Sequence, residues 1–323
     1  MSTHRDLVIK TDNLTKTYGQ VEALKGLDLQ VPRNSIFGFL GPNGAGKTTT
    51  MKLLLGLIRP TLGSGTVFGH NIVDDSIAIR ARIGYLPQQP RFMPDMTARE
   101  TLRFAARFFY TGPGQAIEQR IDDMLDLVGL RDKADRPVKG FSGGERQRLG
   151  LAQAQVNEPD LLILDEPAAA LDPIGRLDVL RIMEHLRQRT TIFYSTHILD
   201  DVQQVSDTVA ILNHGVLVAQ GPIEQLLAGS ETPIYTISLR GNNIDDSLAR
   251  VSSLPWVRDV DVVHRDGMST WQVSVADERA AEAQLLRRVL DDPQVVVTAF
   301  QRKRYELEEI FVNIVEGDNH GRP

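Results

Sequence analysis

Cysteine is absent from this chain of 323 residues, which excludes disulfide bonds, thiolate metal sites and a cysteine nucleophile. Long apolar runs are also absent, since the longest, such as "LLLGLI" and "LLIL", are far too short to span a bilayer. The first residues, "MSTHRDLVIK", lack the apolar core of a signal peptide. The net charge is −6 with both signs interspersed, so nothing indicates a nucleic-acid partner. We therefore expect a soluble, cytoplasmic protein.

The length of the chain and a hydrophobic content of 41% are enough for two domains. The composition changes at "AGSETP", which is typical of a linker. Beyond it the pattern predicts strand–helix–strand–strand–helix–strand, the order of a ferredoxin-like α+β fold, and then a last helix at "ELEEIFVNIV". The predicted parts are a main domain at residues 6–228 with a helical subdomain at about 95–158, a linker at 229–233, a C-terminal domain at 234–316 and a flexible tail at 317–323.

Strands and helices alternate in the main domain. The segments "LVIKTDNLTKTY", "ALKGLDLQV" and "SIFGFL" have the pattern of strands, and "TTTMKLLLGLI" and "VLRIMEHLRQR" have helical periodicity. Thr97 and Glu100 form a predicted capping box that opens the helix "RETLRFAARFFY". "LLILDEP" is fully apolar, as expected in a parallel sheet covered on both faces, and "TTIFYSTH" is another strand. "VAILNHGVLVAQG" predicts a hairpin. The main domain is therefore expected to be α/β.

The segment "GPNGAGKT" follows the apolar strand "SIFGFL" and opens a helix, which is the context that a phosphate-binding loop requires. Gly41, Gly44 and Gly46 allow the backbone to turn sharply and to direct N–H groups at phosphate oxygens. Lys47 places a positive charge on the β- and γ-phosphates, and the Thr48 hydroxyl can ligate Mg²⁺. The alternative is a glycine-rich turn that only packs, and the lysine, threonine, strand and helix together argue against it.

The loop alone does not distinguish ATP from GTP. The sequence contains no Asn-Lys-x-Asp motif for guanine. Tyr18, in "TKTYGQ", can stack on adenine, since any base offers a π face. It can equally cover the edge of a sheet. The pattern around it favours stacking, and hence ATP.

Polar residues stand at the carboxyl ends of several predicted strands. "LLILDEP" ends in Asp165 and Glu166, "TTIFYSTH" ends in Ser195, Thr196 and His197, and "IGYLPQ" ends in Gln88. Each could be an ordinary strand-end residue, and for a lone histidine that would be the better interpretation. Because ligands of open parallel sheets bind at the carboxyl ends of the strands, we expect one shared nucleotide site.

Charge and hydrogen-bonding capacity suggest roles at that site. Asp165 can hold Mg²⁺ directly or through a water molecule. Glu166 can orient or deprotonate the attacking water. His197 can hydrogen-bond the γ-phosphate, and the amide oxygen of Gln88 can bind Mg²⁺ or water. These assignments are predictions from residue type and position.

A second segment suited to anions lies in "FSGGERQRLG". Ser142 and Glu145 form a Ser-x-x-Glu capping box, and Gly143 and Gly144 leave backbone N–H groups accessible at a helix start. The chain has one complete nucleotide loop, so this second site has nothing to hold in its own subunit. We expect it to close on the γ-phosphate of a partner subunit. The Glu145 carboxylate would repel a triphosphate unless the cap or an arginine of "ERQR" neutralises it.

These motifs, in this order, resemble the nucleotide-binding subunits of ATP-binding cassette (ABC) transporters over roughly residues 6–225. The resemblance adds the Q-loop glutamine, the signature "FSGGE", Walker B "LLILDE" and the D-loop "AAALD". It implies a P-loop NTPase with a mixed sheet core, an N-terminal antiparallel β-subdomain and a helical subdomain. The implied nucleotide-binding residues are Tyr18, Gly41, Pro42, Asn43, Gly44, Ala45, Gly46, Lys47, Thr48, Thr49, Ser142, Gly143, Gly144, Glu145 and Asp172. The implied Mg²⁺ ligands are Thr48, Gln88 and Asp165, and the implied catalytic residues are Glu166, His197 and Gln88.

The resemblance also implies partners. It predicts an ATPase that dimerises head to tail around two ATP molecules, with a second copy of itself or a homologous subunit. This dimer would drive a separate transmembrane permease from the inner face of the cell membrane. The C-terminal domain ending in "YELEEIFVNIV" is similar to the extension of a bacterial branch that serves exporters of drugs, lipids, sodium, polysaccharides or metal-related cargo.

Two departures from the family pattern stand out. The signature has Phe141 and Glu145 where the family usually has leucine and glutamine. The D-loop has Ala168 and Ala169 before Asp172, where a threonine and a serine are common. The loss of these hydroxyls is expected to weaken contacts across the dimer without abolishing activity.

The helical stretch "DMTARETLRFAARFFY" is the predicted docking surface for the permease. It carries four aromatic residues, Phe104, Phe108, Phe109 and Tyr110. A helix buries one stripe, so we expect about half of them in the core. We expect some of Phe92, Met93, Met96 and Phe104 to contact a short cytosolic helix of the permease.

Two other functions compete with the transporter. A soluble ABC-type ATPase could act without a permease in translation, repair or regulation. Such proteins typically carry two cassettes or a long coiled-coil insertion, whereas this chain has one P-loop and no heptad array. A regulatory module could bind ATP without hydrolysing it, and Glu166 and His197 argue against that.

Overall fold

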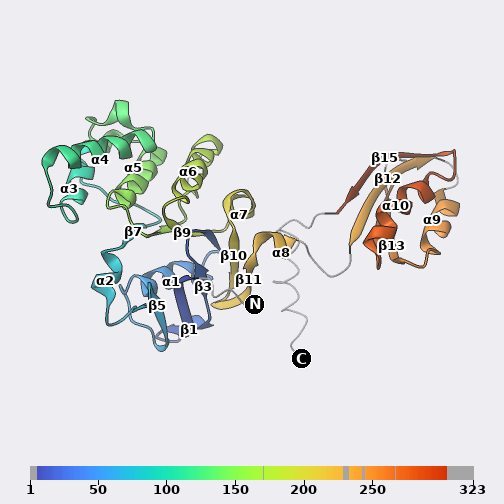
Figure 1. The fold of residues 1–323 in the computed structure, drawn as a ribbon, viewed down its shortest axis with the longest axis horizontal. Coiled ribbons are helices and arrows are strands. Elements are labelled where there is room, and N and C mark those ends of the chain that lie inside the picture. Colours follow the sequence, from blue (N-terminus) through green and yellow to red (C-terminus); the bar gives the residue numbers. More distant parts are fainter. Residues whose placement is uncertain (1–5, 170, 228–232, 242–243, 266, 304–323) are drawn as a thin grey trace. The chain divides into compact units, whose positions relative to one another are not determined.

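A computed structural model describes residues 6–169, 171–227, 233–241, 244–265 and 267–303, and the chain divides into two compact units after Ile223 (Figure 1). Nearly all of the predicted linker at 229–233 lies outside the described residues. So do the predicted helix "ELEEIFVNIV" and the predicted tail at 317–323. No helix of the described part is long and apolar enough to cross a membrane.

The first unit contains an antiparallel sheet close to its N-terminus. Its strands run in the order β2-β1-β5-β6, and β3 also pairs with β1. Their bounds are β1 (Leu7–Tyr18), β2 (Val21–Leu27), β3 (Gln30–Pro32), β5 (Leu62–Val67) and β6 (His70–Asn71). This sheet confirms the expected antiparallel β-subdomain.

The second sheet of this unit carries the strand ends singled out in the sequence. Its order is β11-β10-β4-β9-β8-β7, and all neighbours are parallel except β11, which pairs antiparallel with β10. The bounds are β4 (Ile36–Leu40), β7 (Ile83–Leu86), β8 (Leu161–Asp165), β9 (Thr191–Thr196), β10 (Thr208–Asn213) and β11 (Val216–Pro222). Every residue of β4, β8, β9 and β10 is buried, which for β8 confirms the prediction from the fully apolar run "LLILDEP". The sheet is mixed, as expected.

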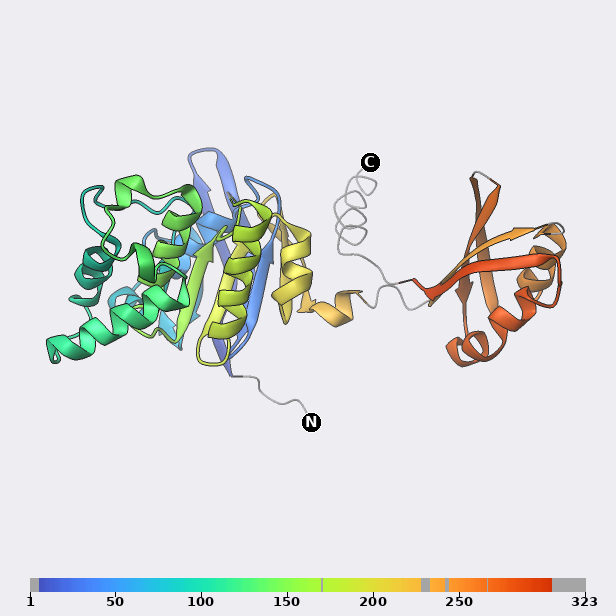
Figure 2. The same ribbon diagram turned by 90° about the horizontal axis from the view of Figure 1, so that it is seen from above.

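Helices complete the first unit, and three of them form the helical subdomain, the green helices of Figure 2. That subdomain holds α3 (Ala98–Ala106), α4 (Gly114–Leu127), α5 (Gly143–Gln155) and the 3₁₀ turns η1 (Arg131–Lys133) and η2 (Val138–Gly140). The predicted capping box at Thr97 and Glu100 is present. The remaining helices of this unit are α1 (Lys47–Leu54), α2 (Ser76–Arg80), α6 (Pro173–Leu186) and α7 (Leu199–Val205), and the short helix α8 (Ile223–Leu227) begins at its last residue.

Helix α6 begins six residues earlier than its apolar pattern predicts. Asp172 caps it by accepting a hydrogen bond from the amide of Gly175 at 3.2 Å. Pro173 occupies the first helical position, where its fixed φ and missing N–H favour a helix start. The cap and the proline therefore set this boundary, and the apolar periodicity does not.

The second unit is a four-stranded antiparallel sheet with two helices. Its chain order is β12 (Ile234–Gly241), α9 (Ile244–Ser252), β13 (Val257–Arg265), β14 (Met268–Val275), α10 (Glu278–Val289) and β15 (Val295–Arg302). The strands lie in the order β13-β14-β12-β15. This is the ferredoxin-like arrangement that the sequence predicts. Trp271 is fully buried in its core, among residues of both helices and of the sheet.

The helical subdomain packs directly on the sheet at Gly84, which generates a test of the fold. A Cβ at Gly84 would lie 1.9 Å from the carbonyl oxygen of Ala154 in α5. We expect Gly84→Ala to lower the free energy of unfolding by about 1–3 kcal/mol, because α5 must move away from β7. Urea unfolding followed by circular dichroism measures this change.

Gly112→Ala is the matched control, since a Cβ there meets nothing within 4 Å. It should change the free energy of unfolding by less than about 0.5 kcal/mol. Equal unfolding curves for the two variants would contradict the close packing of α5 on β7.

Candidate functional site

The phosphate-binding loop connects β4 to α1 in the first unit. Gly46, the N-cap of α1, has φ +111°, and a Cβ there would lie 2.6 Å from the carbonyl oxygen of Ala23. Only glycine fits this combination of backbone conformation and space. No side chain caps α1, so its first amide groups remain available to an anion.

Lys47, the first residue of α1, is buried beneath this loop with 6% of its surface exposed. Its ammonium group donates hydrogen bonds to the carbonyl oxygens of Gly41, at 2.7 Å, and Pro42, at 3.2 Å. It also lies 3.3 Å from Oε1 of Glu166. Lys47 therefore joins the phosphate-binding loop to the end of β8.

Asp165, at the end of β8, is held by two hydroxyl groups. Thr48 Oγ1 donates to Asp165 Oδ2 at 2.8 Å, and Ser195 Oγ donates to Asp165 Oδ1 at 2.6 Å. The Ser195 oxygen also accepts a hydrogen bond from the amide of Glu166 at 2.9 Å. Asp165 and Ser195 are cross-strand neighbours in the parallel sheet, which is why these groups meet.

Glu166 turns its carboxylate toward three other predicted site residues. Its backbone has φ +49°, a left-handed conformation that is uncommon outside glycine and is found at functional sites. Oε1 lies 3.3 Å from Lys47 Nζ, and Oε2 lies 3.3 Å from both His197 Nδ1 and Gln88 Nε2. The structure thus brings together residues that are separated by up to 150 positions in the sequence.

The negative charge of Asp165 also affects Tyr85 on β7. Burial and the nearby Asp165 carboxylate raise the pKa of Tyr85 to about 12. Both effects disfavour a charged phenolate. Tyr85 therefore stays neutral near pH 7 and adds no negative charge beside the two carboxylates.

Tyr18 lies at the end of β1, next to the hairpin that leads into β2. Its side chain is 46% exposed, and Lys16 Nζ lies 5.0 Å from the centre of its ring. An exposed ring leaves a face available for a base. That Tyr18 stacks on adenine stays a prediction.

The signature segment forms the expected capping box at the start of α5. The amide of Glu145 donates to Ser142 Oγ at 3.2 Å, and the amide of Ser142 donates to Glu145 Oε2 at 2.7 Å. Lys133 in η1 donates to Glu145 Oε1 at 2.6 Å. The hydrogen bonds from Lys133 and then from Ser142 lower the pKa of Glu145, so its carboxylate stays charged and is paired.

Of the groups that the sequence offered to neutralise Glu145, the cap is confirmed and the two arginines are wrong. The sequence offered Arg146 or Arg148, besides the cap, as partners of Glu145. Arg148 instead pairs with Asp178 on α6, with 3.5 Å between Arg148 Nη1 and Asp178 Oδ2. Arg146 is exposed on α5. Lys133 lies twelve positions before Glu145, and no local pattern marks that pairing.

The signature glycines are accessible but do not meet the phosphate-binding loop. A Cβ on Gly143 would meet nothing within 4 Å, and one on Gly144 would meet only Leu171, at 3.5 Å. Among the described residues, no hydrogen bond or ion pair joins the segment 142–145 to residues 41–49. Asp172 likewise bonds within its own helix, through the amide of Gly175. These residues therefore form a separate group.

Sequence reasoning placed Ser195 at the shared edge of the sheet but gave it no role in the site. Its hydroxyl contacts both Asp165 and the backbone of Glu166, and its side chain is fully buried. The available signal was its position at the end of "TTIFYSTH", beside the strand that ends in Asp165. Only the register of β8 against β9 shows that the two residues are direct neighbours.

Comparisons with known proteins agree on one family. The model of the ABC transporter family matches residues 24–169. The ABC transporter ATP-binding protein YxlF of Bacillus subtilis is 35% identical over 309 residues, which cover 95% of this chain and 99% of YxlF. The bacitracin transport ATP-binding protein BcrA of Bacillus licheniformis is 42% identical over 221 residues, 68% of this chain and 71% of BcrA. The daunorubicin resistance ATP-binding protein DrrA3 of Streptomyces coeruleorubidus is 38% identical over 224 residues, 69% of this chain and 71% of DrrA3.

Solved structures match the first unit in extent. The dimeric post-hydrolysis structure of the ATP-binding cassette MJ0796 with ADP and Pi has a TM-score of 0.62 and 26% identity, and covers 67% of this chain and 98% of that chain. CbiO1 of Clostridium perfringens, part of the ABC transporter complex cbiONQ, has a TM-score of 0.64 and 28% identity, and covers 69% of this chain and 92% of that chain. The chain belongs to the ATP-binding subunits of ABC transporters, which are ATPases.

Proposed function

We propose that this chain is the ATP-hydrolysing subunit of an exporter and that Glu166 prepares the attacking water. The observation that carries the proposal is the position of the Glu166 carboxylate, 3.3 Å from each of Lys47, His197 and Gln88. A carboxylate at the edge of a phosphate-binding loop can accept a proton from water as its oxygen attacks the γ-phosphorus. His197 then donates a hydrogen bond to the γ-phosphate, where negative charge accumulates.

Lys47 and the loop amides bind the triphosphate in this proposal. The ammonium group already lies against the loop carbonyls of Gly41 and Pro42, so a small movement directs it at the β- and γ-phosphates. The uncapped start of α1 supplies amide donors for the same oxygens. Tyr18 covers the adenine, since its ring is partly exposed beside the cationic Lys16.

Mg²⁺ fits the pair formed by Thr48 and Asp165. Their hydroxyl and carboxylate oxygens lie 2.8 Å apart, and oxygen donors of this kind suit Mg²⁺. The side-chain N–H group of Gln88 donates a hydrogen bond to Glu166. The amide oxygen of Gln88 therefore remains available to the ion or to a bound water. When bound, Mg²⁺ would neutralise charge on the β- and γ-phosphates.

The signature segment completes the site of a second subunit. Gly143 faces open space at a helix start and a Cβ on Gly144 would meet only Leu171, so their backbone N–H groups can bind an anion from outside. MJ0796, to which this chain is similar, is dimeric with ADP and Pi. We therefore place Ser142, Gly143 and Gly144 of one subunit on the γ-phosphate bound by the other, with Asp172 at the same interface.

An exporter is favoured over a soluble ATPase that acts without a permease. The relatives BcrA and DrrA3 are named for bacitracin transport and daunorubicin resistance, and CbiO1 is part of a transporter complex. The described part of this chain has no helix that could cross a membrane, so a separate permease would provide the path. The chain would act from the inner face of the membrane, where ATP is available.

The permease-binding surface lies on the helical subdomain, around Met93, Met96 and Phe104. Met93 is 57% exposed and Phe104 is 46% exposed, and together with Met96 they line a groove of about 520 Å³.

Phe108 and Phe109 are exposed as well. Of the four aromatic residues, only Tyr110 is partly buried, and its hydroxyl donates a hydrogen bond to the carbonyl oxygen of Val156. The expectation that about half of these aromatics fill the core was therefore wrong. An amphipathic helix of the permease would cover this apolar surface.

Glu166→Gln tests the catalytic proposal. Glutamine keeps the shape of the side chain but accepts no proton, so turnover should fall at least about 100-fold while ATP binding remains. Steady-state phosphate release and ATP binding by calorimetry measure the two effects. Lys47→Ala serves as the contrast, since it should lose tight ATP binding itself. Normal turnover by the glutamine variant would contradict the role of Glu166.

Glu145→Gln tests whether the signature charge affects dimer closure. It leaves the positive charge of Lys133 beside the segment that meets the partner's triphosphate. We expect ATP-dependent dimerisation, measured by light scattering in the Glu166→Gln background, to become roughly tenfold faster at low salt. An unchanged rate at every salt concentration would mean that Glu145 only caps α5.

Stability against pH provides the control for this variant. Because the folded-state pKa of Glu145 is lowered, its carboxylate stabilises the fold above its ordinary pKa, and this contribution is lost as pH falls through the lowered value. At pH 7 the parent chain should therefore have a higher urea midpoint of unfolding than the Glu145→Gln chain. This difference between the two midpoints should disappear in strong acid.

Phe104→Asp tests the permease-binding surface. A charge in the groove should prevent copurification with the co-expressed permease, because the charge would lose its water in the contact. Ile77→Asp on α2 is the control, since Ile77 is 78% exposed and does not line this groove. Retained binding by Phe104→Asp, with both variants hydrolysing ATP alone, would place the permease elsewhere.

A further inference from the structure

A partly buried ion pair joins α6 to α7 outside the nucleotide site. Asp201 on α7 is 1% exposed, and its Oδ1 accepts a hydrogen bond from Nε of Arg176 on α6. Arg176 also lies 3.8 Å from Asp200. Burial raises the pKa of Asp201 and Arg176 opposes this change, so the carboxylate depends on this cation. Loss of Arg176 would leave a buried charge without its partner.

The two partners lie close to two functional segments in the chain. Arg176 is one helical turn after Asp172, and its amide donates to the Asp172 carbonyl oxygen at 2.9 Å. Asp201 is four residues after His197, in the first turn of α7. The ion pair therefore connects the helix that begins at the D-loop to the helix that follows the switch histidine.

The connection continues into β9. The hydroxyl of Tyr194, which is buried, donates to the carbonyl oxygen of Asp201 at 3.3 Å and lies 2.8 Å from Ser206 Oγ. Tyr194 directly precedes Ser195, which contacts Asp165 and Glu166. The chain between Tyr194 and Asp201 is thus fixed at both ends, with His197 in its middle.

We propose that Arg176 and Asp201 are positioning residues that hold His197 in place relative to the D-loop. The proposal rests on the proposed function, in which Asp172 meets a second subunit and His197 meets the γ-phosphate. Movement of Asp172 on dimer closure would shift the start of α6. The ion pair would pass that shift to α7, and so to His197 beside Glu166. Hydrolysis would in this way depend on the arrival of the partner.

The test is a double-mutant cycle in kcat. Arg176→Met should lower kcat about tenfold while leaving the Kd for ATP within about twofold, because only the position of His197 changes. In a His197→Ala chain, Arg176→Met should cause no further loss. Arg176→Lys, which keeps the charge, should recover most of the activity. An equal loss of kcat with and without His197 would overturn the proposal.

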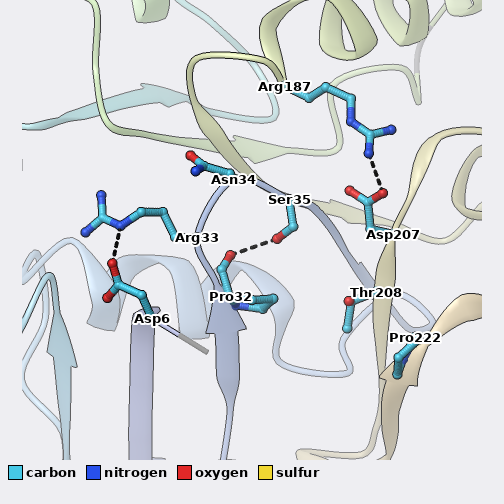
Figure 3. A pocket seen from close by; sticks show the side chains of 9 residues that line it. All are labelled: Asp6, Pro32, Arg33, Asn34, Ser35, Arg187, Asp207, Thr208 and Pro222. Carbon is cyan, nitrogen blue, oxygen red and sulfur yellow. Dashed lines mark hydrogen bonds and ion pairs between the residues drawn. The ribbon is translucent and has the colours of Figure 1, made fainter. Parts of the chain in front are cut away.

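The opposite end of α6 offers a matched control. Arg187 follows the last residue of α6 and pairs with Asp207 at 2.6 Å, as Figure 3 shows. Asp207 also accepts the amide of Ile36, at the start of β4, away from the end that carries the phosphate-binding loop. Arg187→Met should lower the urea midpoint yet leave kcat unchanged.

A loss of kcat in Arg187→Met equal to that in Arg176→Met would overturn the positioning role, because it would indicate general loosening of α6. All assays use the full-length chain, and unfolding curves establish that each variant is folded at the assay temperature. A wild-type chain without ATP turnover would contradict the proposed function instead. The two failures are therefore distinguishable.

Discussion

The Ser195 hydroxyl makes the contact on which the geometry of this site depends. It donates to Asp165 and accepts the amide of Glu166, and it is fully buried between β8 and β9. Through this one group the two carboxylates acquire fixed and different directions. Asp165 meets Thr48 on α1, whereas Glu166 turns to Lys47 and His197. Two adjacent acids can thus take separate roles, one toward a metal ion and one toward water.

This arrangement brings most, but not all, of the residues predicted to bind nucleotide together in one chain. The phosphate-binding loop, the acids and the switch histidine meet at the carboxyl edge of the parallel sheet, as expected for this class of fold. The signature segment at the start of α5 is accessible, its charge is paired with Lys133, and in the described part of the chain it makes no hydrogen bond or ion pair to the phosphate-binding loop. The proposed second subunit would account for both features. ATP would then link the two chains, because its triphosphate would contact both.

Much of this could be predicted from the sequence because the governing patterns are local. A glycine-rich loop between an apolar strand and a helix specifies phosphate binding, and the rule for parallel sheets brings Asp165, Glu166 and His197 to one edge. The ferredoxin-like second unit followed from strand and helix periodicity alone. The short helix α2 escaped notice, since five residues give no measurable periodicity.

Features that depend on tertiary contacts could not be predicted. The pairing of Glu145 with Lys133 requires the path of the chain through η1 and η2, which no spacing rule supplies. The exposure of Phe104 depends on which stripe of α3 faces inward, and the helix buries its small and aliphatic residues instead. Phe108 lies beyond the end of α3 at Ala106, although the sequence predicted that the helix continues to Tyr110. No local sequence pattern marks the contact between Arg176 and Asp201, which are 25 positions apart.

The central claim is that one active site needs two chains, and mixing two inactive variants tests it most directly. Lys47→Ala disables the phosphate-binding loop but leaves the signature segment intact. Gly143→Asp disables the signature segment but leaves the phosphate-binding loop intact, and there is open space for the new side chain. Each variant alone should hydrolyse little ATP. The account predicts that their mixture regains activity, because the mixed dimer contains one complete site. A mixture no more active than the sum of its separate components would contradict it.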